Sequence, residues 1–480
     1  MTDTLMVGVS GVRGIVGKDL TPEIVTQWAQ AFGHWALERG KREGGGGKGH
    51  AVVIGRDART SGPSFAAAVT RGLTFVGCDV IDIGLVPTPT VQLAVEHHRA
   101  RGGIAITASH NPIEWNALKF IGPDGIFLDG ADGQRVAELV AQDGGRGKRE
   151  GGGVVSDGGA IERHLDAVLK LPAVDVEGIR KRHCTVALDA VRGAGGPVMK
   201  ALLERLGCEV AGINLETDGQ FPRAPEPIPE NLGGLSTLVK RSGAALGIAV
   251  DPDVDRLAIV DETGAPIGED YTLAFAVRSV LGAQTVRRLE GPDSLTAYPS
   301  NRLKVVCNLS TSLVVEDAAR EFGADVVRTP VGEVHVARAI LRLGAVIGGE
   351  GNGGVMYPAL HAGRDAPVAA ALLLTLLARQ GKRVSELVAA APRYTIVKAK
   401  VARGKRNAEH GMDGVYAALR RRFPEASVDT QDGLRLAWPD CWLHVRRSNT
   451  EPIIRLIGEA PSGAGAQELV DEGRRVCAGS

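Results

Sequence analysis

The sequence has no excess of charge of either sign and no long apolar run. Its 480 residues include 56 basic and 56 acidic side chains, which gives a formal net charge of zero. Such a balance gives no support for a nucleic-acid-binding face or a polybasic membrane anchor. No apolar run approaches the roughly 20 residues that span a bilayer, and residues 1–11 lack the features of a signal peptide. We therefore expect a cytoplasmic protein.

The sequence also lacks paired cysteines. Its six cysteines are scattered and include no C-x-x-C pair, so reduced thiols packed as small apolar residues are favoured over a disulfide framework or a zinc site. The chain is too long for one ordinary core, and 44% hydrophobic with 23% charged residues is typical of globular proteins. These features predict a globular protein of several domains.

One short pattern occurs three times, in which a helical stretch ends at a glycine and an apolar run follows. The three glycines are Gly77, Gly207 and Gly323. Another apolar run precedes each helix, at residues 52–55, 186–189 and 305–308. Strand, helix and strand in this order indicate βαβ units with largely parallel strands. The glycines lie about 120 residues apart, which is a domain length and not a solenoid repeat.

We therefore expect an α/β protein with three similar tandem α/β domains, built on mixed, largely parallel sheets, and a smaller C-terminal α+β domain. The pattern changes after Ala391, where residues 394–401 alternate like a strand, 408–422 suggest a helix, and 434–436 and 442–445 suggest short strands. Glycine-rich residues 143–153 are expected to form the first linker. The expected domains are residues 1–150, 151–258, 259–385 and 386–480.

The first segment with functional residues is 104–112, where an apolar strand runs into T-A-S-H-N-P. Ligands gather at the carboxyl ends of strands in parallel sheets. This position makes Ser109 a candidate nucleophile or phosphate carrier, with His110 beside it. A polar turn with a capping serine is the alternative.

The second segment places Asp251, Asp253 and Asp255 between two apolar runs. Three like charges at a buried strand end are costly unless a cation binds, and hard oxygen ligands suit Mg²⁺. An EF-hand is excluded because its sixth position, which needs glycine, is Arg256. A haloacid-dehalogenase pattern would need a different residue at position 255. A solvent-exposed acidic turn stays open as an alternative.

The third segment is the glycine-rich turn 348–354. Glycines permit close approach of the backbone to a ligand, and Glu350 and Asn352 are candidates to bind sugar hydroxyls. His361 and Arg364 follow closely and add polar groups. A glycine-rich turn without a ligand is the alternative.

The fourth segment is 446–455, a run of hydroxyl and amide side chains framed by Arg446 and Arg455. Hydroxyls, backbone N–H groups and arginines suit a phosphate dianion. A solvated surface turn is the alternative.

Taken together and in this order, the four segments resemble the α-D-phosphohexomutase superfamily. The similarity runs from Ser10 to Ala460, and the runs T-A-S-H-N-P and R-x-S-N-T-E-P-x-x-R are highly specific. The resemblance implies four domains, one Mg²⁺ per chain, and interconversion of hexose 6-phosphate and hexose 1-phosphate. The reaction would pass through a phosphoserine enzyme and a hexose 1,6-bisphosphate, which also serves as activator.

The resemblance also implies roles for individual residues. Ser109 matches the phosphorylated serine, whose phosphate is a further metal ligand. The other metal ligands would be Asp251, Asp253 and Asp255. The basic residues around the moving phosphoryl group would be Arg13, Lys119 and Arg256, with Lys119 and His110 as candidate proton carriers. The substrate-binding residues would be Glu350, Asn352, Arg364, Arg446, Ser448, Asn449, Thr450 and Arg455.

Some positions depart from the pattern of the superfamily, and they bear on the substrate. Pro252 follows the first aspartate, Asn352 and Gly354 replace a serine and a histidine, and Val334 replaces a basic residue. The runs W-N-A-L-K, G-G-E-G-N-G-G and L-H-x-G-R-D are most similar to the phosphoglucosamine mutase branch, including archaeal-type members. We therefore expect glucosamine phosphate as substrate, with phosphomannomutase or phosphoglucomutase activity, or a non-catalytic sugar-phosphate-binding protein, as alternatives. The expected partner is a small sugar phosphate, not nucleic acid or membrane, and both a monomer and a homodimer remain open.

Overall fold

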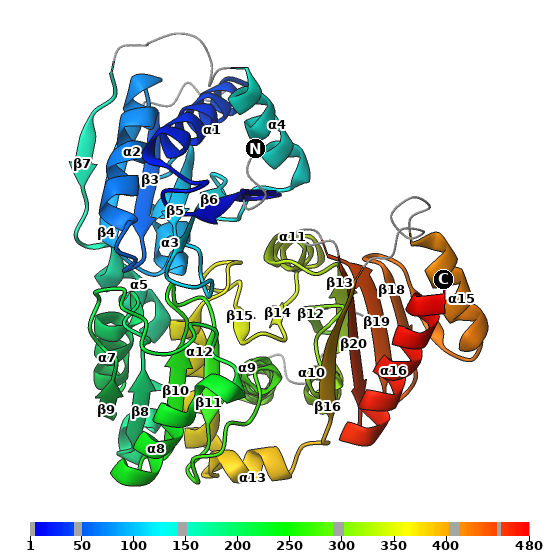
Figure 1. The fold of residues 1–480 in the computed structure, drawn as a ribbon. Coiled ribbons are helices and arrows are strands. Elements are labelled where there is room, and N and C mark those ends of the chain that lie inside the picture. Colours follow the sequence, from blue (N-terminus) through cyan, green and yellow to red (C-terminus); the bar gives the residue numbers. More distant parts are fainter. Residues whose placement is uncertain are drawn as a thin grey trace.

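The computed structural model of the protein describes residues 5–42, 50–142, 151–290, 302–402, 412–448 and 453–479. Four sheets follow one another along the chain, from the blue first domain to the orange and red fourth domain (Figure 1). Helices accompany each sheet, so the expected combination of three α/β domains and a C-terminal α+β domain is confirmed. In the described part of the chain, no helix is both long and apolar enough to cross a bilayer.

The first domain has a seven-stranded sheet in the order β1-β2-β6-β5-β3-β4-β7. Its strands are β1 (Met6–Gly8), β2 (Gly11–Ile15), β3 (Ala51–Arg56), β4 (Asp79–Leu85), β5 (Gly102–Ile106), β6 (Trp115–Ile121) and β7 (Val154–Ser156). Its helices are α1 (Pro22–Arg42), α2 (Gly62–Phe75), α3 (Thr88–His97) and α4 (Gly130–Ala141). Successive residues of a strand point to opposite faces: Val52 and Ile54 pack with α1, α2 and α4, and Val53 packs with α3.

The second domain has a four-stranded sheet in the order β11-β10-β8-β9. Its strands are β8 (Thr185–Asp189), β9 (Glu209–Ile213), β10 (Leu246–Val250) and β11 (Leu257–Val260). Its helices are α5 (Ala160–Leu169), α6 (Val176–Arg182), α7 (Gly195–Arg205) and α8 (Gly233–Ser242), with the short 3-10 helix η1 (Pro229–Asn231).

The third domain has a four-stranded sheet in the order β13-β12-β14-β15. Its strands are β12 (Lys304–Asn308), β13 (Asp325–Thr329), β14 (Ile347–Glu350) and β15 (Gly354–Met356). Its helices are α9 (Asp270–Glu290), α10 (Leu313–Arg320), α11 (Glu333–Leu343), α12 (Ala366–Gln380) and α13 (Val384–Ala389). One continuous apolar cluster contains residues of both the second and the third sheet, so these two domains share a core.

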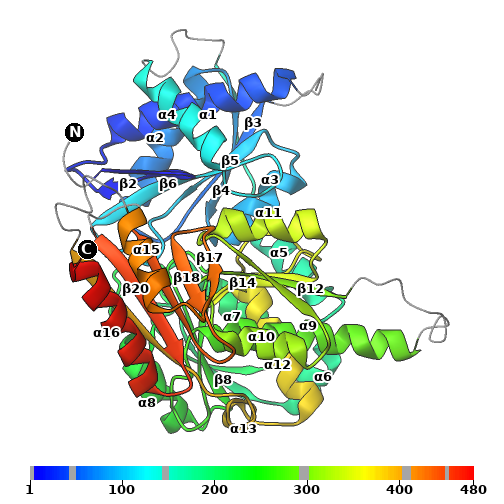
Figure 2. The ribbon, with the colours of Figure 1, turned by 90° about the vertical axis from the view of Figure 1, so that its right-hand side faces the viewer.

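The fourth domain has a five-stranded antiparallel sheet in the order β16-β20-β19-β18-β17. Its strands are β16 (Thr395–Ala402), β17 (Ser427–Asp429), β18 (Leu434–Ala437), β19 (Trp442–Arg447) and β20 (Ile453–Ala460). The helices α15 (Asp413–Arg422) and α16 (Gly463–Gly479) pack on this sheet (Figure 2).

The first three domains repeat one arrangement of four strands. An antiparallel pair, β5–β6, β10–β11 or β14–β15, adjoins a parallel strand, β3, β8 or β12, which adjoins another, β4, β9 or β13. The predicted helix-ending glycines adopt left-handed φ values of 86° at Gly77, 82° at Gly207 and 64° at Gly323. The first three candidate segments, which contain Ser109, Asp251 and Glu350, therefore lie at equivalent positions in the three domains. Each is at the connection between the two strands of the antiparallel pair.

All three expected domain boundaries need correction. The boundary after residue 385 falls inside α13, which begins at Val384 and ends at Ala389. The other two boundaries fall within sheets. Strand β7 pairs with β4, so the first sheet continues past residue 150. The boundary after residue 258 falls inside β11, whose pairing with β10 extends to Val260. Both boundaries were set by local composition, whereas the sheets are completed by pairing between distant segments. The expected first linker, 143–153, lies partly outside the described residues, as does the start of the helix expected at 408–422.

Candidate active site

The turn between β5 and β6 presents Ser109. All residues of β5 are buried, and the chain turns immediately after it, so that Ser109 has a left-handed φ of 48°, uncommon for a residue other than glycine. The Ser109 N–H donates to Thr107 Oγ1 at 2.9 Å, and that hydroxyl donates to Asp57 Oδ2 at 2.6 Å. These bonds hold the serine in an otherwise unfavourable backbone conformation.

A buried arginine, Arg59, holds the same turn through its carbonyl groups. Its guanidinium donates to the carbonyl oxygens of Ser109 at 2.7 Å, Asn111 at 2.6 Å, Pro112 at 2.7 Å and Trp115 at 3.0 Å. The Asp57 carboxylate lies 3.2 Å from Arg59 Nε. Asp57 and Arg59 are not among the predicted site residues, although they directly follow the apolar strand β3, where site residues are expected.

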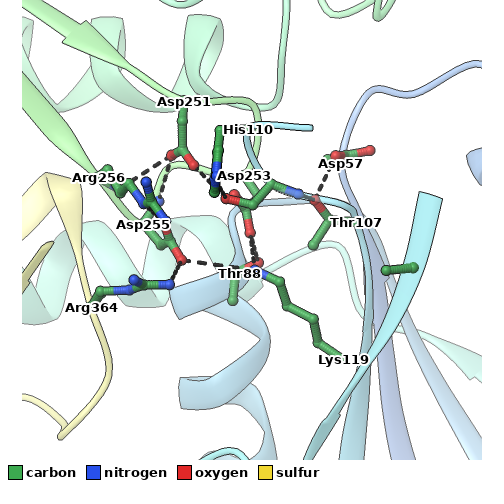
Figure 3. Close-up of polar contacts among 12 residues, drawn as sticks. Asp57, Thr88, Thr107, His110, Lys119, Asp251, Asp253, Asp255, Arg256 and Arg364 are labelled. Carbon is green, nitrogen blue, oxygen red and sulfur yellow. Dashed lines mark hydrogen bonds and ion pairs between the residues drawn. The ribbon is translucent and has the colours of Figure 1, made fainter. Parts of the chain in front are cut away.

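The turn between β10 and β11 brings the three predicted aspartates together (Figure 3). Asp251, Asp253 and Asp255 are each at most 1% exposed, and each offers an oxygen within 4.8 Å of the others. Ser109 Oγ donates to Asp251 Oδ2 at 2.7 Å. The other Asp251 oxygen accepts the N–H groups of Asp255 and Arg256 at 3.2 Å. Two segments 142 residues apart thus form one site.

Cationic side chains neutralise two of the aspartates. Lys119 Nζ lies 2.7 Å from Asp253 Oδ2 and 3.8 Å from Asp255 Oδ2, and an Arg364 nitrogen donates to Asp255 Oδ2 at 2.6 Å. Burial opposes ionisation of Asp253, but the Lys119 charge and hydrogen bond outweigh it and lower the pKa of Asp253. Burial, and then the charges of Asp255 and Asp253, raise the pKa of Asp251 well above its usual value.

The acidic site fits a divalent cation. Asp253 Oδ1 and Asp255 Oδ1 are buried, and neither has a hydrogen-bond partner among the residues that the structure describes. Buried carboxylate oxygens without partners are costly. A hard cation such as Mg²⁺, which prefers oxygen ligands, would satisfy both. The second oxygen of each carboxylate is fixed by Lys119 or Arg364, so the donors are already oriented.

Three further predicted residues lie in or near the serine turn, namely His110, Arg256 and Arg13. His110 Nδ1 lies 3.3 Å from Ser109 Oγ, and Nε2 of the same ring lies 3.9 Å from Glu226. The Arg256 charge, and then desolvation, lower the pKa of His110 to about 2, so its imidazole is neutral near pH 7. Arg13 donates to the side chain of Asn111 at 3.2 Å.

Glu350, at the end of β14, is joined to the acidic site. Its Oε1 accepts from Asn308 at 2.9 Å and from the Gly332 N–H at 3.1 Å, and its Oε2 accepts from Arg364 at 2.8 Å. Burial opposes ionisation, but the Arg364 charge outweighs it and lowers the pKa of Glu350. Asn352, in the next turn, accepts the Gly354 N–H at 3.2 Å.

The predicted phosphate-binding residues form a separate group in the fourth domain. Arg446 on β19 and Arg455 on β20 are opposite one another in the strand register. Arg446 donates to Asp432 at 2.9 Å, and the Ser448 N–H donates to the Ile453 carbonyl at 2.9 Å. Asn449 and Thr450 lie outside the described residues.

The sequence also matches known proteins over nearly its whole length. It matches the models of phosphoglucomutase/phosphomannomutase alpha/beta/alpha domains I, II and III over residues 4–145, 162–264 and 291–394, and that of the C-terminal domain over 396–476. A phosphoglucomutase/phosphomannomutase of Thermococcus kodakarensis is 39% identical over 470 residues, 97% of each chain. A probable phosphoglucosamine mutase of Methanopyrus kandleri is 38% identical, covering 97% of this chain and 96% of the relative.

A solved structure is also similar to this chain over nearly the whole length of both. The crystal structure of a phosphoglucomutase/phosphomannomutase family protein from Burkholderia thailandensis has a TM-score of 0.82 and 27% identity, and the match covers 98% of this chain and 97% of the other. The fold and the site define a phosphohexomutase, an isomerase. This chain belongs to the phosphoglucomutase/phosphomannomutase family.

Proposed function

We propose that the protein interconverts hexose 6-phosphate and hexose 1-phosphate through a phosphorylated Ser109 and a hexose 1,6-bisphosphate. One observation carries this proposal: Ser109 Oγ, on a turn held in a left-handed conformation, donates to a member of a buried aspartate triad at 2.7 Å. A phosphate carrier beside a cation site is what phosphoryl transfer requires, because this chemistry depends on positioning and charge stabilisation. A non-catalytic homologue would not need Ser109 together with all three aspartates.

In this proposal Asp251, Asp253 and Asp255 hold one Mg²⁺. When bound, the ion supplies positive charge that stabilises the transferring phosphoryl group. Arg13, Lys119 and Arg256 add further positive charge around the same group. Burial lowers the affinity of Lys119 for its proton, but the Asp253 and Asp255 charges outweigh it and raise the pKa of Lys119.

The two candidate proton carriers therefore differ in charge. Lys119 is cationic and is bonded to Asp253, so it suits charge stabilisation. Its raised pKa makes it a weak proton donor. The neutral His110 ring is within 3.3 Å of Ser109 Oγ and suits proton acceptance from the serine hydroxyl, although its low pKa makes it a weak base.

We propose glucosamine phosphate as the substrate, with Glu350 and Asn352 binding the sugar hydroxyls. The printed name of the Methanopyrus kandleri relative supports this choice, and that of the Thermococcus kodakarensis relative supports the alternative, mannose or glucose phosphate. The phosphate that is not reacting would be held by the fourth domain. The residues proposed for this are Arg446, Ser448, Asn449, Thr450 and Arg455.

The experiment that tests the proposal replaces Ser109 with alanine. Turnover of glucosamine, glucose and mannose phosphates is measured with a trace of the corresponding 1,6-bisphosphate, and peptide mass spectrometry locates phosphate. We expect phosphate on Ser109 of the unmodified protein, and a loss of about a thousandfold in Ser109→Ala, equivalent to about 4 kcal/mol of transition-state stabilisation. Ser64→Ala, at an exposed serine of α2, is the matched control.

The two parts of the proposal fail separately. Undiminished turnover in Ser109→Ala would refute the phosphoserine route. A higher kcat/KM for mannose or glucose phosphate than for glucosamine phosphate would leave the reaction in place and replace the substrate.

A further inference from the structure

Arg364 contacts three segments of the second and third domains: the β10–β11 turn, the end of β14 and the start of α11. It follows β15 and precedes α12, and its side chain is only 10% exposed. One guanidinium nitrogen donates to Asp255 Oδ2 at 2.6 Å, and another donates to Glu350 Oε2 at 2.8 Å. Its Nε lies 3.0 Å from Glu333 Oε2. Two guanidinium nitrogens thus hydrogen-bond carboxylates, and the third lies close to another without a hydrogen bond to it.

The stem of this arginine occupies the space over Gly354. A Cβ atom added at Gly354 would lie 2.2 Å from Arg364 Cδ and 2.9 Å from its Cγ. Any other residue at position 354 would force the arginine away from its present path. The absence of a side chain at Gly354 therefore leaves the space through which Arg364 reaches Asp255. Figure 3 shows the Arg364 side chain directed at Asp255.

A guanidinium is suited to such a bridge. Its donors form a rigid planar fork, so two carboxylates bound to one fork are fixed relative to one another. Removing one partner of a buried ion pair leaves an uncompensated charge, so Asp255 and Glu350 each affect how Arg364 holds the other. A change in charge at Asp255 therefore changes how strongly Arg364 pairs with Glu350.

We propose that Arg364 is a positioning residue that couples the cation site at Asp255 to the sugar-binding carboxylate of Glu350. This inference rests on the proposed function. A divalent cation on Asp255 Oδ1 withdraws negative charge from the carboxylate whose Oδ2 Arg364 holds. The guanidinium therefore pairs more strongly with Glu350 and fixes it for the sugar. By thermodynamic reciprocity, a sugar phosphate must then tighten the binding of the cation by the same factor.

The test measures this coupling without turnover. In full-length Ser109→Ala protein, the dissociation constant of Mn²⁺ is determined by calorimetry and electron paramagnetic resonance, with and without saturating glucosamine 6-phosphate. We expect the sugar phosphate to tighten Mn²⁺ binding about fivefold or more, within the usual range of such couplings. Adding Arg364→Gln should bring this ratio to within about twofold of one.

The same variant separates coupling from simple loss of the metal site. Removing the guanidinium removes a positive charge that opposes the cation, so Mn²⁺ alone should bind Arg364→Gln no more weakly than it binds the parent protein. A tenfold weaker binding of Mn²⁺ alone would mean that Arg364 only maintains the site, and would overturn the proposal. Arg364→Lys should recover little of the coupling, because one ammonium cannot bridge both carboxylates in a fixed geometry.

Gly354→Ala provides an independent variant, which carries the test where Arg364→Gln does not fold. It keeps every charge but crowds the stem of Arg364, so it should reduce the coupling as Arg364→Gln does. Gly130→Ala adds the same methyl group at the start of α4, where nothing lies within 4 Å, and should keep the full coupling. Equal coupling in these two glycine variants would refute the proposal.

The remaining outcomes distinguish this inference from the proposed function. No coupling in the Ser109→Ala parent, or coupling unchanged by Arg364→Gln, would refute the role of Arg364 even where the unmodified protein is an active mutase. Absence of turnover by the unmodified protein on every hexose phosphate would refute the proposed function itself.

Discussion

Two groups of carboxylates inside this protein differ in what stabilises them. In the candidate active site, Asp253 and Asp255 each bind a cationic side chain, Lys119 at 2.7 Å and Arg364 at 2.6 Å. One oxygen of each carboxylate nevertheless has no hydrogen-bond partner among the described residues. These acids are charge-compensated but not fully hydrogen-bonded.

The second group lies where the third and fourth domains meet. The partly buried Asp270 accepts the Ser312 N–H at 2.9 Å, and the buried Glu459 of β20 accepts the Leu313 N–H at 2.9 Å, both at the start of α10. One cation of this region, Lys398, lies 3.6 Å from the neighbouring Glu269. These acids accept backbone N–H groups but have little charge compensation, and Glu459 Oε1 also has no hydrogen-bond partner among the described residues. The two groups therefore differ in charge compensation and not in complete hydrogen bonding.

The difference appears in the pKa values. Enclosure in the protein, and more weakly the charges of Glu459 and Glu269, raise the pKa of Asp270 to about 7, although the Ser312 N–H opposes this. The pKa of Asp253 is instead lowered, because Lys119 outweighs its burial. A backbone N–H satisfies a hydrogen bond, whereas only a nearby cation keeps a buried carboxylate ionised and ready for a metal. Clustering of acids alone therefore does not define a metal site.

The largest expected effect separates the two groups by turnover. Asp255→Asn removes a charge from the proposed cation site and should lower kcat/KM about a thousandfold, corresponding to about 4 kcal/mol. Asp270→Asn keeps the acceptor oxygen and lies outside that site, so it should stay within about threefold of the unmodified protein. Chelation should stop turnover in the unmodified protein and in Asp270→Asn, and Mg²⁺ should restore it in both.

Comparable losses in the two asparagine variants would mean that the two groups do not differ in function. Turnover that persists in a chelator would show that the aspartate triad does not hold a required metal.

A smaller effect concerns protons in the active site. Because the pKa of Asp251 is raised well above its usual value, a proton competes with a cation for this carboxylate as the pH falls. Mn²⁺ affinity should therefore increase with pH, by up to about tenfold per pH unit for one proton released. Asp251→Asn should remove this slope, and Asp270→Asn should keep it. Calorimetry in buffers of different ionisation enthalpy measures the proton release, and an unchanged slope in Asp251→Asn would contradict the assignment.

The sequence predicts what depends on local pattern. The helix-ending Gly77, Gly207 and Gly323, and the apolar runs around them, identify the repeated α/β domains because strand and helix periods extend over a few residues. Ser109 and Asp251 were found for the same reason, since each follows an apolar strand at its carboxyl end.

The remaining features of the site depend on contacts between distant segments. Thr88 donates to Asp253, which is 165 residues away, and Arg364 bridges Asp255 and Glu350 from positions 109 and 14 residues away. No local pattern indicates that Arg59 holds four carbonyls of the serine turn. The role of such residues follows only from the packing of the domains against one another.

The smallest expected effect concerns stability at the junction of the third and fourth domains. The pKa of Asp270 is about 7 in the folded protein, above its usual value of 3.8, so between these values the folded state binds more protons than the unfolded state. Folding stability contributed by this group is therefore present at low pH and is lost as the pH rises through about 7.

Asp270→Asn cannot ionise and keeps an oxygen for the Ser312 N–H, so it should raise Tm at pH 8 by about 2–6 °C, given the usual relation between free energy and Tm. The same variant should raise Tm by less than half as much at pH 5, because only part of this stability is lost between the usual pKa of 3.8 and pH 5. Glu468→Gln, at an exposed carboxylate of α16, is the control and should leave Tm unchanged at both values. Calorimetric scans of the three proteins at pH 5 and pH 8 measure this difference. A lower Tm for Asp270→Asn at pH 8 would show that the ionised carboxylate stabilises the junction, and that the two groups of acids are compensated alike.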